Sequence, residues 1–112
     1  MARIELRTLI TAPRERCFDL SLSVDFHTHS TAQTGERAVA GKLTGLLSLG
    51  EEVTWRARHF GVWQTLTSRI TAYDRPAHFR DSMVRGAFER FDHDHYFDPA
   101  PNGQTLLRDL FD

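Results

Sequence analysis

Apolar and polar residues alternate along most of this chain. At 3–11 the sequence "RIELRTLIT" places Ile4 and Leu6 between charged neighbours, which is the pattern of a strand with one buried face. Further strand-like runs occupy 36–41, 51–60, 62–73, 78–85, 87–97 and 104–112. The pattern therefore predicts about seven strands.

Between the first two of these strands the apolar spacing becomes helical. Pro13 stands near a first helical position, and Phe18 and Leu22 lie four residues apart on one face, so a short helix is predicted within 11–23. The next stretch, "VDFHTHSTAQTG" at 24–35, is either a second short helix or an irregular turn that ends at Gly35.

Turn-forming residues separate the later strands. They are Gly61, "DRPA" at 74–77, "RG" at 85–86 and "DPAPNG" at 98–103, while the glycine-containing stretch 42–50 predicts a loop. Short connections of this kind favour an antiparallel meander. The chain shows neither a repeat nor a linker, and 112 residues suffice for one core, so we expect a single domain over 1–112.

Composition and charge disfavour several classes of protein. The 14 basic and 15 acidic residues are interspersed and give a formal net charge of −1, so no basic surface for nucleic acid is expected. The sequence lacks a signal peptide and an apolar run of about 18 residues, which predicts a cytoplasmic protein without an integral membrane segment. The single Cys17 is expected in the core. We recognise no nucleophile elbow and no phosphate-binding glycine loop, and no cofactor is expected.

The stretch "FDHDHYF" at 91–97 combines histidines and aspartates with large aromatic residues, so it is the main candidate for a functional site. Strand alternation places Phe91, His93, His95 and Phe97 on one face, and the apolar flanks indicate that this is the inner face.

Counting strand pairs back from the adjacent turns suggests the partners of this strand. Across "DPAPNG" the count sets His93 opposite Asp109, with His95 opposite Leu107 and Phe91 opposite Phe111. Across "RG" the count sets Phe79 beside His93 and Asp81 beside Phe91.

A buried patch of Asp81, His93 and Asp109 has three interpretations. It could be a self-satisfied network that fixes the register of the sheet, a set of ligand contacts, or an acid–base site in which His93 or His95 moves protons with Asp109. A metal site would need further ligands from His59, His78 or Asp109, and because no stereotyped ligand set is present, none is assigned.

The strand at 51–60 supplies a second inner face. Val53, Trp55, Ala57 and His59 share that face, and the intervening positions are polar. Trp55 is interpreted as core filling, as a ligand wall, or as both.

Several stretches together resemble the SRPBCC superfamily. They are "GLLSLGEEVTWRARHFG", "LTSRITAYDRP", "FERFDHDHYF" and "TLLRDLFD", in the order strand, two short helices and further strands, and the resemblance covers nearly the whole chain from Ile4. The likeness is strongest to bacterial proteins grouped with polyketide cyclase/dehydrase-like and lipid-transport proteins. There "S-x-D-x-H-x-x-S", "G-E-E-V-T-W-x-A-x-H-F-G" and "H-x-H" recur, here at 23–30, 50–61 and 93–95.

This resemblance implies an α+β START-like, or helix-grip, fold. Such a fold wraps a curved antiparallel sheet around a hydrophobic pocket and ends in a long C-terminal helix across its mouth. Here the sequence stops at Asp112, where the last strand should finish, so we expect that helix to be missing. An uncovered sheet would expose apolar lining and promote a homodimer.

The resemblance also implies a function. We expect binding of a small hydrophobic molecule such as a lipid, a polyketide or an aromatic or isoprenoid-like compound, with transport as a role that such binding can serve. Non-catalytic binding is preferred. The alternatives are a cyclase- or dehydratase-like enzyme that uses His93 or His95 with Asp109, and a regulatory protein-interaction module. The expected ligand-binding residues are His27, Ser30, Trp55, His59, Phe79, Asp81, Phe91, His93, His95, Phe97, Leu107, Asp109 and Phe111.

Overall fold

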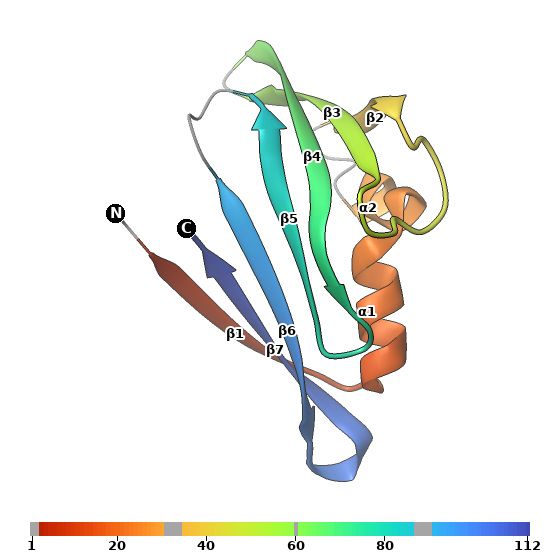
Figure 1. Ribbon diagram of the computed structural model, residues 1–112, viewed down its shortest axis with the longest axis vertical. Helices are drawn as coiled ribbons and strands as arrows, with labels where there is room; N and C mark the ends of the chain where they lie inside the picture. Colours follow the sequence, from red (N-terminus) through yellow and green to blue (C-terminus); the bar gives the residue numbers. More distant parts are fainter. Residues whose placement is uncertain (1–2, 31–34, 60, 87–90) are drawn as a thin grey trace.

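The computed structural model describes residues 3–30, 35–59, 61–86 and 91–112, and Figure 1 shows its elements. In chain order these are β1 (Ile4–Ile10), α1 (Arg14–Leu22), α2 (Val24–Ser30), β2 (Arg37–Gly41), β3 (Glu52–His59), β4 (Val62–Asp74), β5 (His78–Arg85), β6 (Asp92–Ala100) and β7 (Gln104–Phe111).

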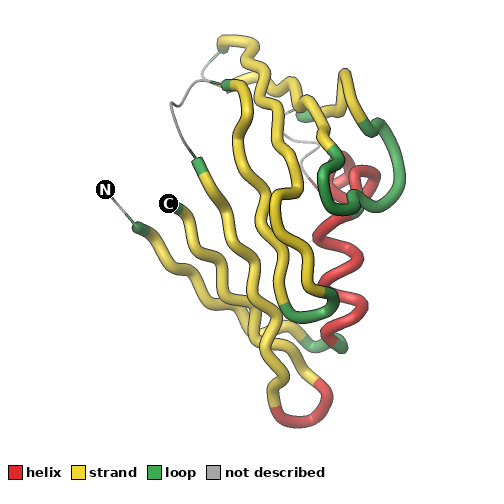
Figure 2. Tube along the Cα trace, in the orientation of Figure 1, coloured by secondary structure: helices red, strands yellow, loops and turns green. Residues whose placement is uncertain are grey.

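The strands form one antiparallel sheet in the order β1-β7-β6-β5-β4-β3-β2. Strands β2 to β7 follow one another as a meander, and β1 pairs with β7, with Ile4 opposite Phe111. Figure 2 shows this curved sheet with α1 and α2 gathered on one side of it, and a short 3-10 turn at Pro101–Gly103 between β6 and β7. The expected α+β architecture, with a curved antiparallel sheet of seven strands and two short helices after the first, is confirmed.

Helix α1 anchors the core through one face. Phe18 and Leu22 are 0 % and 2 % exposed, and Cys17 is buried beside them, as expected. The ring of Phe18 meets Phe79 and Phe97 edge to face at 5.4 Å between centroids. In the described part of the chain, no helix is both long enough and apolar enough to cross a membrane.

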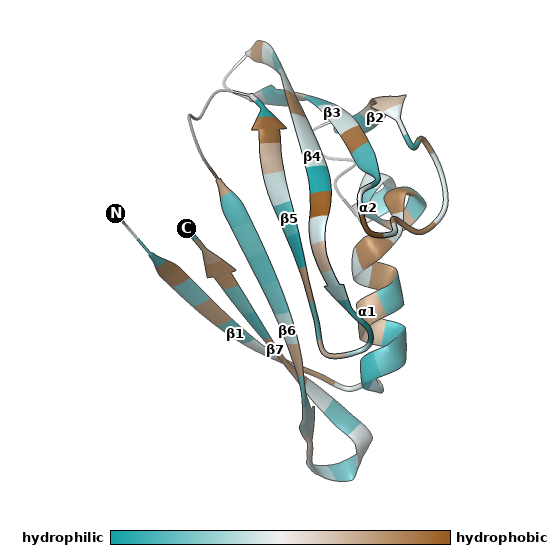
Figure 3. Ribbon diagram, viewed as in Figure 1, coloured by the Kyte–Doolittle hydropathy of each residue, from teal (hydrophilic) through white to brown (hydrophobic). Residues whose placement is uncertain are grey.

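Alternation along the strands decides which side chains enter the interior. On β3, Val53 and Ala57 are buried and Trp55 packs against the core, whereas Arg56 and Arg58 are exposed. Figure 3 shows how hydrophobic and hydrophilic residues alternate along several of the strands. The concave face of the sheet, against α1 and α2, is therefore the inner face.

The predicted pairing of β6 with β7 is wrong by two residues. His93 lies opposite Phe111, and His95, not His93, lies opposite Asp109. The reason is the turn: β6 continues through Ala100, and the chain reverses at Pro101–Gly103, later than the residue count assumed. Since the slip is an even number of residues, every side chain keeps its predicted face.

The predicted pairing of β5 with β6 is wrong in the same way. Asp81 lies opposite His93 and Phe79 lies opposite His95, in place of Phe91 and His93. Strand β5 ends at Arg85 and β6 begins at Asp92, so the connection is longer than the two-residue turn assumed at "RG". The start of the predicted strand, at 87–90, lies outside the described residues.

Candidate functional site

A cavity of about 330 Å³ lies between the two helices and the concave face of the sheet. Its size falls in the range of small-molecule sites. Its walls are mostly apolar, and its polar lining comes mainly from two places, a His27–Glu36 pair and a group of histidines and carboxylates on the central strands. The apolar lining residues are Leu22, Val24, Leu47, Val53, Trp55, Leu66, Ile70, Phe79 and Phe91.

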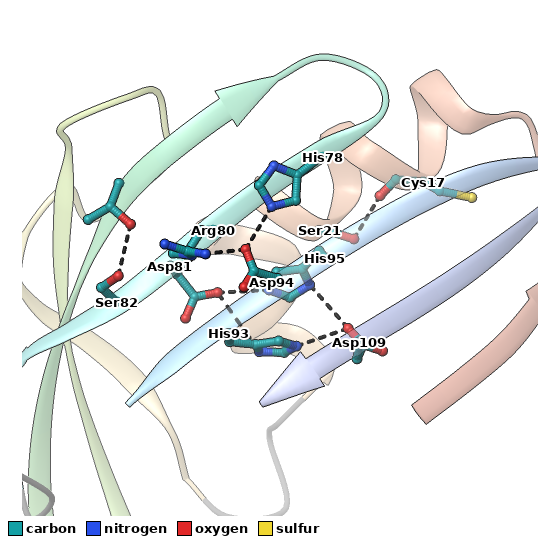
Figure 4. A network of polar contacts seen from close by, with 11 residues as sticks. Cys17, Ser21, His78, Arg80, Asp81, Ser82, His93, Asp94, His95 and Asp109 are labelled. Atoms are coloured by element: carbon teal, nitrogen blue, oxygen red, sulfur yellow. Dashed lines mark hydrogen bonds and ion pairs between the residues drawn. The ribbon is translucent and has the colours of Figure 1, made fainter. Parts of the chain in front are cut away.

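Three adjacent strands bring Asp81, His93, His95 and Asp109 together, and we call these four residues the His–Asp cluster. On one side, Nε2 of His95 donates a hydrogen bond to Oδ2 of Asp81 at 2.8 Å, and Nδ1 of His93 lies 3.9 Å from the same oxygen. On the other side, Nε2 of His93 donates to Oδ1 of Asp109 at 2.9 Å, and Nδ1 of His95 lies 3.3 Å from it. Figure 4 shows the two imidazoles between the two carboxylates.

Aromatic stacking holds the two imidazoles in place. The rings of His93 and His95 stack with centroids 3.7 Å apart. Phe111 covers His93 at 4.0 Å, and Phe79 covers His95 at 4.1 Å, so four rings form one continuous stack. Because their faces are covered, both histidines can present only their nitrogen-bearing edges to the carboxylates.

The cluster favours charged groups despite its burial. Burial acts to raise the pKa of the Asp109 carboxyl group, but hydrogen bonds from His93 and His95 outweigh it and hold this pKa well below its ordinary value of 3.8. Burial likewise acts to lower the pKa of His95, but contacts with Asp109 and Asp81 outweigh it and raise this pKa above 6.5. The cluster can therefore keep carboxylates and a protonated imidazole beside an apolar cavity, a combination suited to acid–base or ligand-orienting chemistry.

A second polar point lies where α2 meets β2. Nε2 of His27 lies 2.5 Å from Oε1 of Glu36, and the His27 ring packs on Trp55 at 4.2 Å between centroids. Sequence reasoning named His27 and Trp55 but missed Glu36, because the contact joins α2 to the residue just before β2, and no local pattern pairs these segments. The side chains of Ser30 and His59, also expected in the pocket, lie outside the described part of the chain.

The other expected site residues fall into three groups. Trp55, Phe79, Asp81, Phe91, His93 and His95 line the cavity, as does His27. Phe97 belongs to the closed core at 1 % exposure, and Leu107 packs against that core. Asp109 contacts both histidines and Phe111 packs on His93, and neither is part of the cavity lining. The lining residues Leu22, Val24, Ser68 and Ile70 went unrecognised as site residues.

The convex face carries a separate group that strand alternation keeps away from the cavity. Nε2 of His78 donates to Oδ1 of Asp94 at 2.7 Å, and Nε of Arg80 donates to the same oxygen at 2.9 Å. Burial acts to raise the pKa of Asp94, but these two donors outweigh it and lower this pKa. His78, considered as a further metal ligand for His93 and His95, therefore stands on the opposite side of the sheet.

Comparison with known proteins identifies the fold. No protein-family model matches the chain, and no curated protein matches it. Ginseng major latex-like protein 151 from Panax ginseng superposes with a TM-score of 0.69 at 15 % identity, over 98 % of this chain and 76 % of that one. TTHA0849 from Thermus thermophilus gives a TM-score of 0.77 at 17 % identity, over 99 % and 73 %. Ms6760 from Mycobacterium smegmatis gives 0.75 at 17 % identity, over 97 % and 70 %.

At sequence identities of 15–17 %, these superpositions show that the chain shares its fold with these proteins. It confirms the helix-grip architecture that the SRPBCC resemblance implied, with a curved antiparallel sheet and two short helices after the first strand.

Proposed function

We propose that this protein binds a small hydrophobic molecule in the cavity between its helices and its sheet. The observation that carries the proposal is the cavity itself, about 330 Å³ with a mostly apolar lining and a few convergent polar groups. The resemblance to the SRPBCC superfamily supports the same class of ligand, which includes lipids, polyketides and aromatic or isoprenoid-like compounds. If the protein binds such a molecule without reacting with it, its role would be transport of that molecule.

The lining indicates how a ligand would be oriented. Trp55 and Phe79 offer flat apolar walls, and Asp81, His93 and His95 lie within the same lining as hydrogen-bonding groups. A molecule with an apolar body and one hydroxyl or carbonyl group would therefore bury its body against the aromatic walls and direct its oxygen at the His–Asp cluster.

Intrinsic fluorescence provides a direct test, because the chain has two tryptophans in different places. Trp55 lines the cavity, while Trp63 is 46 % exposed and stacks with Arg56. In a Trp63→Phe variant Trp55 is the only tryptophan, and titration with an anilinonaphthalene sulfonate or a naphthol should quench its emission saturably. Native mass spectrometry of the purified protein should also detect a lipophilic molecule carried from the cell.

A cavity-filling substitution provides the matched control. Ser68 lines the cavity on β4, whereas Thr65 is an exposed residue of the same strand whose pairing places it on the convex face. Ser68→Phe should abolish quenching, and Thr65→Phe should leave it unchanged. Preparations that carry no lipophile and bind no probe, or binding that survives Ser68→Phe, would refute the proposal.

The contact between the His–Asp cluster and the cavity favours a second candidate, a cyclase- or dehydratase-like reaction. In that case His93 or His95 would move protons to and from the ligand, and Asp109 would orient the imidazole that does so. Incubation with an aromatic polyketide mimic should give turnover that His93→Ala and His95→Ala both remove. If turnover persists in both variants, neither histidine is the catalytic group and this second candidate is excluded.

A further inference from the structure

We propose that Asp81, His93 and His95 form a binding site for a divalent transition-metal ion in the wall of the cavity. Oδ2 of Asp81 lies 2.8 Å from Nε2 of His95 and 3.9 Å from Nδ1 of His93. One donor atom from each residue can be chosen so that all three lie within 4.8 Å of one another. Two imidazoles and one carboxylate are a ligand set that Zn²⁺ and Fe²⁺ both accept.

The spacing of these donors is close to that around a bound ion, and the two stacked imidazoles must rotate so that both nitrogen lone pairs point at it. A first-row divalent ion holds nitrogen and oxygen donors at about 2.0–2.2 Å, so donors around it lie about 3.0–3.5 Å apart. The distances of 2.8 and 3.9 Å bracket that value. The strand pairs Asp81–His93 and Phe79–His95 set these positions through the sheet backbone, so no loop has to fold to assemble the site.

Asp109 supplies the outer support that a metal site of this kind requires. A histidine that binds metal through one ring nitrogen usually donates its other N–H to a carboxylate or carbonyl, which fixes its tautomer. If His93 binds through Nδ1 and His95 through Nε2, their remaining nitrogens lie 2.9 and 3.3 Å from the same oxygen of Asp109. One carboxylate would then orient both imidazole ligands.

Charge and access also favour an ion here. The two carboxylates, Asp81 and Asp109, balance the two positive charges of the ion, and two neutral imidazoles complete the set. Asp81, His93 and His95 all line the cavity, whereas Asp109 stands behind them. The remaining coordination positions would therefore face the cavity, where water or an oxygen atom of a bound molecule can occupy them.

This inference goes beyond the proposed binding of a hydrophobic molecule and does not depend on it. The sequence assigned no metal because it shows no stereotyped ligand set, and the further ligands considered were His59, His78 and Asp109. The missing ligand is Asp81, which the true register of β5 places directly opposite His93.

Metal titration of the untagged protein tests the proposal. Isothermal calorimetry with Zn²⁺ should show saturable one-to-one binding, and Co²⁺ should give visible absorption bands of a protein-bound ion. Long-range ¹H–¹⁵N NMR of the Zn²⁺-loaded wild-type protein should show metal on Nδ1 of His93 and on Nε2 of His95, with protons on the opposite nitrogens. This readout needs no substitution, so it remains decisive if a variant fails to fold.

The variants form a matched set. His93→Gln, His95→Gln and Asp81→Asn should each abolish saturable binding, with circular dichroism to verify the fold. His78→Gln removes a histidine that is likewise bonded to an aspartate, but on the convex face, and should bind as the wild type does. Asp109→Asn should keep the one-to-one ratio and weaken affinity about 10- to 100-fold.

Three results would overturn the proposal. They are the absence of saturable binding in the wild type, binding that survives His93→Gln and His95→Gln, and NMR evidence that the metal sits on the nitrogens facing Asp109. Probe binding measured with a chelator present tests the hydrophobic-ligand proposal separately, so failure of one proposal is distinguishable from failure of the other.

Discussion

Phe18 shows how much a single residue decides in this fold. It is fully buried, and its ring lies 5.4 Å, edge to face, from each of Tyr73, Phe79 and Phe97. These contacts join α1 to three strands. The helical spacing within 11–23 predicted that Phe18 points inward, but no local pattern identifies which strands it meets.

Removal of this ring should be costly. Phe18→Ala deletes a buried aromatic side chain at the junction of four elements, and we expect it to lower the free energy of unfolding by about 3–5 kcal/mol. Urea denaturation followed by circular dichroism measures the loss. Leu20→Ala, at a position 37 % exposed on the same helix, should cost less than about 1 kcal/mol and serves as the control. Equal losses from the two substitutions would contradict the assignment of Phe18 as the centre of the core.

At the scale of elements, the β2–β3 hairpin depends on a glycine. Gly41 ends β2 at a φ of +74°, and a Cβ added there would lie 2.5 Å from the carbonyl oxygen of Glu52. Gly50, in the same connection, has a φ of +83° and open space around it. Both glycines therefore need a positive φ, but a side chain would clash with neighbouring atoms only at Gly41.

This contrast makes a paired prediction. Alanine at Gly50 should cost about 1–2 kcal/mol for the left-handed backbone alone. Gly41→Ala should cost about 1–3 kcal/mol more, because its methyl group also collides with the β3 backbone. Denaturant unfolding of both variants measures the difference, and an equal cost would show that β3 moves away without penalty.

An ion pair fastens α1 to the turn between β4 and β5. Arg75 donates from Nε and Nη2 to the two carboxylate oxygens of Asp19, each at 2.9 Å. The hydrogen bond from Arg75 lowers the pKa of Asp19 from 3.8 and outweighs the opposing effect of burial. Since both side chains are more than a third exposed, solvent screening keeps the contribution small.

The pH dependence of this contribution follows from the lowered pKa. Stabilisation by the pair is fully present above the unfolded pKa and is lost as the pH falls through the folded value. Asp19→Asn should therefore cost up to about 1 kcal/mol at pH 7 and much less near pH 3. Urea unfolding at both pH values tests this, with the Asp19→Asn, Arg75→Ala double variant to close the cycle. If the stability cost of Asp19→Asn is the same at both pH values, the cost comes from packing and not from the ion pair.

At the scale of the whole molecule, the helices leave part of the concave face exposed. Pairing along β1 puts Ile4 and Leu6 on the same face as Phe111 and Asp109, and they are 56 % and 53 % exposed. Figure 1 shows β1 at the edge of the sheet, away from α1 for most of its length. Large apolar side chains gathered on one exposed face favour association.

We expect this face to bind a second copy of the chain. Analytical ultracentrifugation should show a mass that increases with concentration, and Leu6→Lys should return the protein to a monomer. Leu9→Lys is the matched control, since Leu9 lies on the same strand, is 59 % exposed and faces the opposite way. A monomer at all concentrations, or equal effects of the two substitutions, would exclude this surface.

The sequence by itself determined the elements and their faces. Alternation in 91–97 placed His93 and His95 inward, and helical spacing within 11–23 placed Phe18 and Leu22 inward, because side-chain direction repeats with a fixed local period. An error of an even number of residues leaves those faces unchanged, so the inner histidines and the predicted His93–Asp109 contact are both found, although the residues directly opposite each histidine differ from the prediction.

Only the tertiary structure decided which residues lie directly opposite each other and which long-range contacts form. The turn at Pro101–Gly103 and the long β5–β6 connection set Asp109 opposite His95 and Asp81 opposite His93. Packing of α1 and α2 on the sheet then created the cavity and joined His27 to Glu36. Turn length and long-range packing have no fixed period along the chain, so the place of His95 in the His–Asp cluster is decided only when the strands are assembled.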